Sequence, residues 1–258
     1  MQINEDDMVD LSGKKAVVTG AGRGIGRGIA LKLAEAGADL AILYRKKQEP
    51  AAELKGDIEK MGRSCHIYQC DVSNEEVVQQ TFTQIKTGWA RIDILVNNAG
   101  LASWGNTIHD TSSKEWDRVL KANLYGPFYC IREVLPPMRQ QGGGHIVNIS
   151  SSITLNLPAN GGPYTISKIG LEALTKTIAR EETPHNIRVN AVSPGVVETD
   201  MGEKFLGVDD MKTIYDRLPF GRACQPSDIA NTVLFLVSES GSYIQGEVIY
   251  INGGTMGV

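Results

Sequence analysis

Short apolar runs alternate with helix-like segments along the chain, and this alternation constrains the fold more than any other feature of the sequence. Each run is short, rich in β-branched residues and apolar at successive positions, which is typical of strands buried on both faces. The clearest runs are Ala16–Val18, Leu40–Leu43, Ile92–Val96, Ile146–Ile149, Val189–Val192 and Val248–Ile251, with a weaker one at His66–Tyr68.

Helical patterns fill the intervals between these runs. They lie near residues 24–36, 51–62, 74–88, 113–139, 164–182 and 227–238. Ser73 with Glu76, and Ser112 with Glu115, have the spacing of capping boxes and predict two helix starts. Thr183-Pro184 predicts a helix end, because the residue before a proline avoids the helical region. The alternation predicts an α/β fold: a doubly wound parallel sheet of about seven strands with helices on both faces.

Composition and charge narrow the class of protein. The 258 residues contain no linker or repeat, so one domain over residues 1–258 is predicted. A formal charge of −4 gives no electrostatic footprint for nucleic acid or an anionic membrane. The acidic start has no signal-peptide pattern, and the apolar runs are too short to span a membrane, so a cytoplasmic protein is expected. The cysteines and histidines lack zinc-ligand spacing, so no metal site is expected.

A glycine-rich loop follows the first predicted strand and opens a helix. Thr19-Gly20-Ala21-Gly22-Arg23-Gly24-Ile25-Gly26 has the spacing G-x-x-x-G-x-G, which differs from the more familiar G-x-G-x-x-G. Glycines allow a tight turn and close approach to a pyrophosphate, and a helix N-terminus attracts its charge. The loop therefore predicts a dinucleotide site that includes Gly20, Arg23, Gly24, Ile25 and Gly26. The alternative is a glycine-rich turn that only packs.

The end of the second predicted strand indicates which dinucleotide. An NAD site needs a carboxylate there for the ribose 2′-hydroxyl. The chain instead has Tyr44, Arg45, Lys46 and Lys47. These cations, with Arg23, would suit a 2′-phosphate, so NADP is favoured over NAD. Basic residues at a strand exit can also be merely solvated, which leaves NAD as the alternative.

Tyr164 and Lys168 lie one helical turn apart on one face of a predicted helix. A tyrosine pKa of about 10 is too high for easy proton exchange at neutral pH. A neighbouring ammonium should lower it and make Tyr164 a general acid/base. This spacing arises easily by chance, so the pair alone could be a surface contact. Ser151, just past the strand Ile146–Ile149, adds weight because parallel sheets bind ligands at that end.

Together these residues resemble the short-chain dehydrogenase/reductase family over essentially the whole chain. The glycine loop matches the family's T-G-x-x-x-G-x-G, and Ser151, Tyr164 and Lys168 match its catalytic serine and Y-x-x-x-K. The other matching segments are Asp71-Val72, Asn97-Asn98-Ala99-Gly100, Asn123, Pro194-Gly195-Val196-Val197-Glu198-Thr199 and Gly253-Gly254. The resemblance implies a Rossmann-type fold.

The resemblance also implies residue roles. Tyr164 would exchange a proton with the substrate oxygen, and Ser151 would hydrogen-bond the same oxygen. Lys168 would bind the nicotinamide ribose, and Asn123 would fix a water of a proton relay. The cofactor would further contact Asp71, Val72, Asn98, Ala99, Gly100, Pro194, Gly195, Val197 and Thr199.

The implied activity is NADP-dependent hydride transfer to a ketone, sugar, polyol or 3-oxoacyl substrate. Residues 101–104, 153–157 and 199–206 should line the substrate pocket. The family also implies a homotetramer or a homodimer. On the predicted helix 164–182, Ile166, Gly170, Ala173 and Thr177 form a small-residue stripe that would allow a partner helix to approach closely and could equally pack inside the monomer. A catalytically silent nucleotide-sensing protein on the same fold is the remaining alternative, and the filled catalytic positions argue against it.

Overall fold

The computed structural model describes residues 9–103, 105–207 and 211–255 of the chain. Within these ranges, seven strands form one parallel sheet in the order β3-β2-β1-β4-β5-β6-β7. The strands are β1 (Lys15–Thr19), β2 (Asp39–Tyr44), β3 (Cys65–Gln69), β4 (Ile94–Asn97), β5 (Gly144–Ile149), β6 (Ile187–Pro194) and β7 (Val248–Ile251). The strand order reverses between β1 and β4, where doubly wound sheets bind ligands. The predicted fold class is confirmed.

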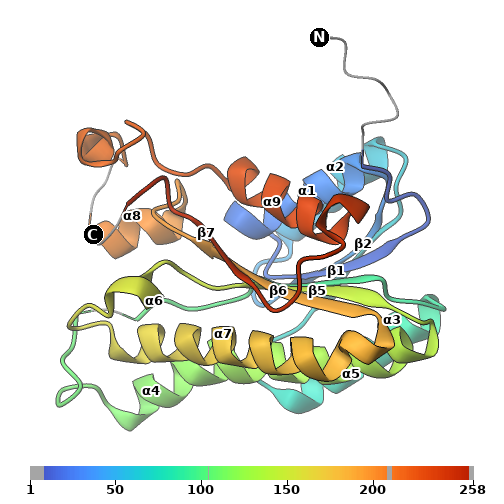
Figure 1. Ribbon diagram of the computed structural model, residues 1–258, viewed down its shortest axis with the longest axis horizontal. Coiled ribbons are helices and arrows are strands. Elements are labelled where there is room, and N and C mark those ends of the chain that lie inside the picture. Colours follow the sequence, from blue (N-terminus) through green and yellow to red (C-terminus); the bar gives the residue numbers. More distant parts are fainter. Residues whose placement is uncertain (1–8, 104, 208–210, 256–258) are drawn as a thin grey trace.

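Helices cover both faces of the sheet (Figure 1). One face carries α1 (Gly24–Glu35), α2 (Glu49–Lys60) and α9 (Pro226–Val237), and the other carries α3 (Glu75–Gly88), α5 (Gly126–Gln140) and α7 (Gly162–Glu182). The shorter α6 (Ile153–Asn156) and α8 (Asp200–Leu206) lie beyond the carboxyl ends of the strands, and α4 (Ser113–Leu120) packs against α7. None of the helices in the described ranges is long and apolar enough to cross a membrane.

The hydrophobic core forms two layers, one on each face of the sheet. Successive residues of β1 alternate between them: Ala16 and Val18 pack in the layer with α1, and Val17 packs in the layer with Phe82 of α3. All three β1 side chains are fully buried. Burial on both faces explains why apolar residues occupy successive positions in the middle of the strands, as the sequence pattern predicted.

The helix predicted near 113–139 is interrupted. Between α4 and α5 the chain forms a five-residue π-helix, η2 (Lys121–Tyr125). Next to it, Gly126 lies so close to Val72 that a Cβ on Gly126 would come within 2.9 Å of a Val72 methyl. Pro127 follows, and it has no N–H for the carbonyl of Asn123, its α-helical partner. The apolar pattern of the sequence continues through this widened turn. The prediction of one helix near 113–139 therefore missed the π-helix.

Two predicted capping boxes have different outcomes. Ser112 caps α4, where its Oγ accepts from the N–H of Glu115 at 3.2 Å. The prediction at Ser73 is wrong, because Asn74 caps α3 and its Oδ1 accepts from Val77 N at 3.2 Å. Ser73 instead donates its hydroxyl to Asp71 at 2.7 Å.

Candidate active site

The glycine loop turns sharply at the carboxyl end of β1 and leads into α1. Gly20 and Gly24 have φ angles of +66° and +54°, which favour glycine. Among the described residues, no side chain caps the N-terminus of α1, and the first turn of the helix contains no acidic residue. The first N–H groups of this helix could therefore bind an anion without a competing carboxylate in that turn.

Four hydrogen bonds hold the glycine loop against the segment that follows β4. The Asn98 amide donates to the carbonyl oxygens of Thr19 at 2.9 Å and Gly20 at 3.1 Å. The Thr19 hydroxyl accepts from the N–H groups of Asn98 and Ala99, each at 3.0 Å. Any Cβ on Gly26 would lie 2.4 Å from the Asn98 amide nitrogen. The loop is thus a fixed cradle with glycine where a side chain would fill it, and it fits a dinucleotide pyrophosphate.

The predicted 2′-phosphate site lies at the end of β2. Tyr44 is the last residue of that strand, and Arg45, Lys46 and Lys47 follow it with exposed side chains. Among the residues that the structure describes, none of these three cations forms a salt bridge. Arg23 differs, because its Nη1 lies 2.8 Å from the Asp200 carboxylate. Arg23 would have to exchange this exposed ion pair for a phosphate.

Asp71 and Val72 follow the end of β3. The Asp71 carboxylate accepts from the N–H and the hydroxyl of Ser73, at 3.1 and 2.7 Å. Val72 is nearly buried against Gly126. The Asp71 side chain therefore fixes the turn that leads into α3.

Ser151 and Tyr164 are brought together from two different elements. Ser151 follows Ser150, whose N–H extends the sheet by donating to the Val192 carbonyl at 2.7 Å. Tyr164 lies in the first turn of α7. A hydrogen bond joins the two side chains. Two hydroxyls, one from the segment after β5 and one from α7, thus meet beyond the carboxyl end of the sheet.

Lys168 lies behind the phenol of Tyr164. Its Nζ is 5.7 Å from the centre of the Tyr164 ring and donates to the Ile149 carbonyl at 2.7 Å. The side chain is 5% exposed. Burial lowers the pKa of Lys168 to about 8, against the opposing effect of the Glu172 carboxylate.

The expected direction of the Tyr164 pKa was wrong. Burial raises the pKa of the Tyr164 phenol, and the hydrogen bond with Ser151 opposes this effect. The ammonium of Lys168 lies over the ring face and donates to the Ile149 carbonyl, so desolvation of the hydroxyl dominates. The phenol is held in its protonated form.

Asn123 lies in η2 and is completely buried. Its Oδ1 accepts from Leu101 N at 2.7 Å, and its Nδ2 donates to Leu101 O at 2.9 Å and Ser167 Oγ at 3.0 Å. The side chain therefore fixes the loop after β4 to α7. A Cβ on Gly100 would lie 3.2 Å from Asn123 Oδ1 and 3.7 Å from Lys168 Nζ, so this loop passes directly beside the ammonium.

The segment from Pro194 to Thr199 leaves β6 and forms the next wall of the site. The Pro194 carbonyl accepts from Ser152 N at 2.8 Å, and a Cβ on Gly195 would lie 2.9 Å from the Asn252 Cα. Val197 is buried. Thr199 caps α8, accepting from Gly202 N at 3.2 Å, and a Cβ on Gly24 would lie 3.2 Å from the Thr199 methyl. The segment therefore closes over the glycine loop.

Three apolar residues of the predicted pocket-lining segments 153–157 and 199–206 have exposed side chains: Leu155, Leu157 and Met201. Trp104 and the side chains of Phe205 and Leu206 were also predicted to line the pocket, and they lie outside the described residues.

Sequence reasoning missed one polar group next to the site. Glu172, one turn after Lys168 on α7, accepts hydrogen bonds from the hydroxyls of Ser150, Thr154 and Ser193. Its spacing of four residues from Lys168 was the available signal, since such residues share a helix face.

Comparisons with known proteins identify the family to which the chain belongs. Residues 20–256 match the family model described as enoyl-(acyl carrier protein) reductase. The 3-oxoacyl-(acyl-carrier-protein) reductase of Aquifex aeolicus is 40% identical over 246 residues, which cover 95% of this chain and 98% of that protein.

Solved structures agree with this assignment. A short-chain type dehydrogenase/reductase from Mycobacterium marinum superposes with a TM-score of 0.88 at 35% identity, covering 96% of this chain and 97% of that one. A 7α-hydroxysteroid dehydrogenase in complex with NADH and 7-oxo glycochenodeoxycholic acid gives a TM-score of 0.90 at 31% identity, covering 98% of each chain. Similarity of this extent, in sequence and in structure, shows that the chain belongs to the short-chain dehydrogenase/reductase family of oxidoreductases.

Proposed function

We propose that the chain is an NADP(H)-dependent oxidoreductase that transfers hydride between the nicotinamide and a carbonyl or secondary alcohol carbon, within one dinucleotide-binding and catalytic domain. The observation that carries this proposal is the hydrogen bond between Ser151 and Tyr164, with the Lys168 ammonium behind the phenol. Two hydroxyls that meet at one point can both bind a single substrate oxygen, as the reduction of a carbonyl requires.

Tyr164 acts as the general acid in reduction. When bound, the nicotinamide supplies the hydride for reduction or accepts it in oxidation. As the new C–H bond forms at the carbonyl carbon, the π electrons move to the oxygen, and Tyr164 gives that oxygen its proton. Ser151 donates a hydrogen bond to the same oxygen. A raised pKa keeps the Tyr164 phenol protonated, which is the form that reduction consumes.

Lys168 and Asn123 return the proton to Tyr164. The Lys168 ammonium would bind the nicotinamide ribose and stabilise the phenolate that forms after proton transfer. The side chain of Asn123 is fully engaged, so its main-chain carbonyl is the group that would hold the relay water. A backbone carbonyl oxygen has two lone pairs, so that of Asn123 can accept from a water in addition to a helix N–H.

The cofactor is proposed to be NADP(H) because of the end of β2. Tyr44 occupies the last position of the strand, and the exposed Arg45, Lys46 and Lys47 offer cations to a 2′-phosphate. NAD(H) is the second candidate, and the NADH complex of the 7α-hydroxysteroid dehydrogenase supports it.

Cofactor preference is testable at Tyr44 and Arg45. The double variant Tyr44→Asp, Arg45→Ala places a carboxylate where NAD sites have one and removes a cation. We expect the ratio of kcat/KM for NADPH over NADH to fall by at least about tenfold, as expected from one lost charge-assisted contact. Lys60→Ala, an exposed cation on α2, is the control. An unchanged ratio in the double variant would mean that the phosphate site lies elsewhere.

The substrate is proposed to be a ketone with an apolar chain, with a 3-oxoacyl thioester first. The exposed Leu155, Leu157 and Met201 offer an apolar rim beside Ser151. The Aquifex aeolicus relative is named for reduction of 3-oxoacyl groups, and the steroid dehydrogenase was solved with a 7-oxo bile acid. A sugar or polyol would need polar donors at this rim instead.

A substrate panel tests the proposed function directly. Purified protein with NADPH or NADH is mixed with acetoacetyl thioesters, β-keto esters, cyclic ketones and sugars, and loss of the reduced cofactor is followed at 340 nm, the usual absorbance band of reduced nicotinamides. We expect turnover with NADPH and the 3-oxo compounds. Turnover restricted to sugars or polyols with NADH would overturn both the substrate and the cofactor assignment.

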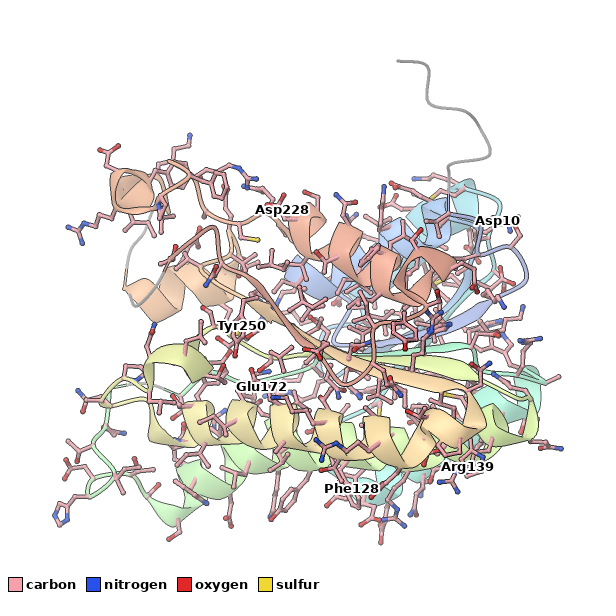
Figure 2. The ribbon with its side chains drawn as sticks, viewed as in Figure 1. Asp10, Phe128, Arg139, Glu172, Asp228 and Tyr250 are labelled. Atoms are coloured by element: carbon pink, nitrogen blue, oxygen red, sulfur yellow. The ribbon has the colours of Figure 1, made fainter. Side chains whose placement is uncertain are left out.

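The chain is also proposed to form a homotetramer. In the stripe predicted on α7, Ile166, Ala173 and Thr177 are exposed, so they do not pack inside the monomer. Phe128 is 40% exposed. Figure 2 shows it on the outer side of the helical layer. A second exposed apolar group, Phe235 and Tyr243, lies at the opposite side of the sheet, near the C-terminal strand. Two separate apolar faces suit two interfaces with copies of the chain.

A further inference from the structure

A carboxylate that the catalytic scheme does not use lies directly behind the active site. Glu172 is on α7, four residues after Lys168 and eight after Tyr164, so the three side chains share one helix face. Figure 2 shows Glu172 on the side of α7 that turns toward the sheet, below Tyr250 of β7. The remaining question is what this carboxylate does there.

Three hydroxyls from three elements converge on Glu172 Oε1. Ser150 Oγ at the end of β5 donates at 2.7 Å, Thr154 Oγ1 of α6 at 2.9 Å, and Ser193 Oγ of β6 at 3.4 Å. The Tyr250 hydroxyl lies 3.4 Å from Thr154 Oγ1. Hydrogen bonds that a carboxylate accepts are stronger than those between neutral groups, so these three contacts hold the elements around Glu172 firmly.

These hydroxyls belong to the turn that presents Ser151. Ser150 precedes Ser151 in the chain, and Thr154 Oγ1 also lies 3.0 Å from the Ser151 carbonyl oxygen. The Thr154 N–H donates to that same carbonyl at 3.2 Å. Glu172 therefore binds both sides of the turn and limits where the Ser151 hydroxyl can point.

The same carboxylate acts on Lys168 through its charge. The groups around the Lys168 ammonium are the Tyr164 ring on α7, the Ile149 carbonyl on β5 and the loop at Gly100, which passes beside it. Glu172 is the described charged residue whose field acts on this ammonium, and it raises the pKa of Lys168 against the effect of burial. Tyr164 and Tyr250 are the other titratable groups that face this region.

We propose that Glu172 is a positioning residue of the active site, which fixes the Ser151 turn through Ser150 and Thr154 and places a negative charge one helical turn from the Lys168 ammonium. This inference rests on the proposed function, because the proposed roles of Ser151 and Lys168 come from it. Glu172 touches neither substrate nor cofactor in this scheme and acts through its two neighbours.

Glu172→Gln separates the charge from the hydrogen bonds. Glutamine keeps a carbonyl oxygen that accepts from the hydroxyls, but it removes the negative charge. We expect the pKa of Lys168 to fall by about one unit, the lower end of the effect of a close opposite charge. Glu181→Gln, an exposed carboxylate at the other end of α7, is the matched control and should leave the pKa unchanged.

The first measurement does not depend on turnover. The protein is labelled with lysine carrying carbon-13 at Cε, and the Lys168 signal, assigned by its loss in Lys168→Met, is titrated by NMR. In the natural chain, titration should be centred near pH 8, in line with the pKa of Lys168. An unshifted midpoint in Glu172→Gln would overturn the electrostatic role.

The second measurement uses the pH profile of kcat/KM for carbonyl reduction with saturating NADPH. We expect Glu172→Gln to match the natural chain within about twofold at pH 6, and to lose about tenfold at pH 8.5, because one pKa unit on a basic limb is a factor of ten. A uniform loss at every pH would show that Glu172 is only structural.

A second variant tests the positioning of Ser151. Glu172→Ala removes the acceptor as well as the charge, so kcat at pH 6 should fall about tenfold, the size of one lost positioning contact, with the cofactor Kd unchanged. Equal kcat at pH 6 in the alanine and glutamine variants would overturn this part of the proposal. If the natural chain itself reduced no carbonyl compound, the proposed function would fail, whereas the NMR titration would still test the link between Glu172 and Lys168.

Discussion

At the scale of single residues, burial controls the charge states in the active site. Tyr164 and Lys168 were expected from the sequence to form a pair in which the ammonium lowers the pKa of the phenol. Their spacing was enough to place both side chains together. The sign of the effect depends on the depth of the site and on the Ile149 carbonyl, which the ammonium contacts. Neither can be predicted from a spacing of four residues.

The burial of Lys168 should lower the stability of the protein at neutral pH. Its pKa falls from 10.5 to about 8, so the folded chain binds fewer protons than the unfolded chain between these values. The free energy of unfolding attributed to this group is therefore lower below pH 8 and recovers as the pH rises toward 10.5. At about 1.4 kcal/mol per pKa unit, the penalty at pH 7 is about 3 kcal/mol.

Lys168→Met tests this penalty. Methionine fills a similar volume without a charge. The variant should therefore have a higher free energy of unfolding than the natural chain, and this gain should be larger at pH 7 than at pH 9.5. Urea unfolding at both pH values measures the difference, and the gain should shrink by about 2 kcal/mol. A gain that is equal at the two pH values would show that the ammonium is not desolvated in the folded chain.

At the scale of elements, the sequence predicted strands and helices well where a repeating pattern defines them. All seven predicted strand regions correspond to strands in the sheet. The predictions were wrong where a single local interaction decides which residue caps a helix or where a helix is interrupted. Ser73 and Asn74 are both good caps, and Asp71 takes the Ser73 hydroxyl, which leaves Asn74 to cap α3. The π-helix η2 ends next to Gly126, which lies against Val72, a residue far away in the sequence.

The glycine loop gives the sharpest test at this scale. Gly26→Ala places a methyl group 2.4 Å from the Asn98 amide nitrogen and 2.7 Å from the Gly20 carbonyl oxygen. Because both atoms hold the cradle in shape, we expect the Kd for NADPH to rise at least about tenfold, the effect of losing about 1.4 kcal/mol of binding energy. Fluorescence titration of the reduced cofactor measures it.

Gly56→Ala in α2 is the matched control. A Cβ there meets no atom within 4 Å, so the substitution should leave the cofactor Kd unchanged and slightly stabilise the helix. Equal Kd values for Gly26→Ala and the natural chain would show that the loop does not bind the pyrophosphate.

At the scale of the whole molecule, the structure has exposed apolar residues that the proposed tetramer would cover. The composition predicted a globular protein, but only the structure separates exposed from buried apolar positions. The stripe on α7 had two interpretations from the sequence alone, and the structure divides it. Ile166, Ala173 and Thr177 are exposed, whereas Gly170 is half-buried and a Cβ on it would lie 3.0 Å from the Leu124 side chain. Two exposed aromatic residues, Tyr125 at the end of η2 and Phe128 at the start of α5, add to the exposed apolar surface.

Ala173→Arg tests the proposed tetramer. A guanidinium buried at a helix interface without a partner destabilises association strongly, so the variant should elute as dimers or monomers. Light scattering coupled to size exclusion gives the mass. Gln84→Arg on the exposed side of α3 is the control and should keep the mass of the natural chain. A tetramer in both variants would place the interface elsewhere.

The proposed function depends most on the role of Tyr164 as the proton donor, and one measurement tests this role directly. Tyr164→Phe removes the hydroxyl and keeps the ring that lies beneath the Lys168 ammonium. We predict that kcat for ketone reduction with NADPH falls at least about a thousandfold, the range of general acid catalysis. The Kd for NADPH should change less than twofold. The control variant Tyr243→Phe, at a fully exposed tyrosine, should keep full activity. Retention of a tenth or more of the natural kcat in Tyr164→Phe would contradict the account.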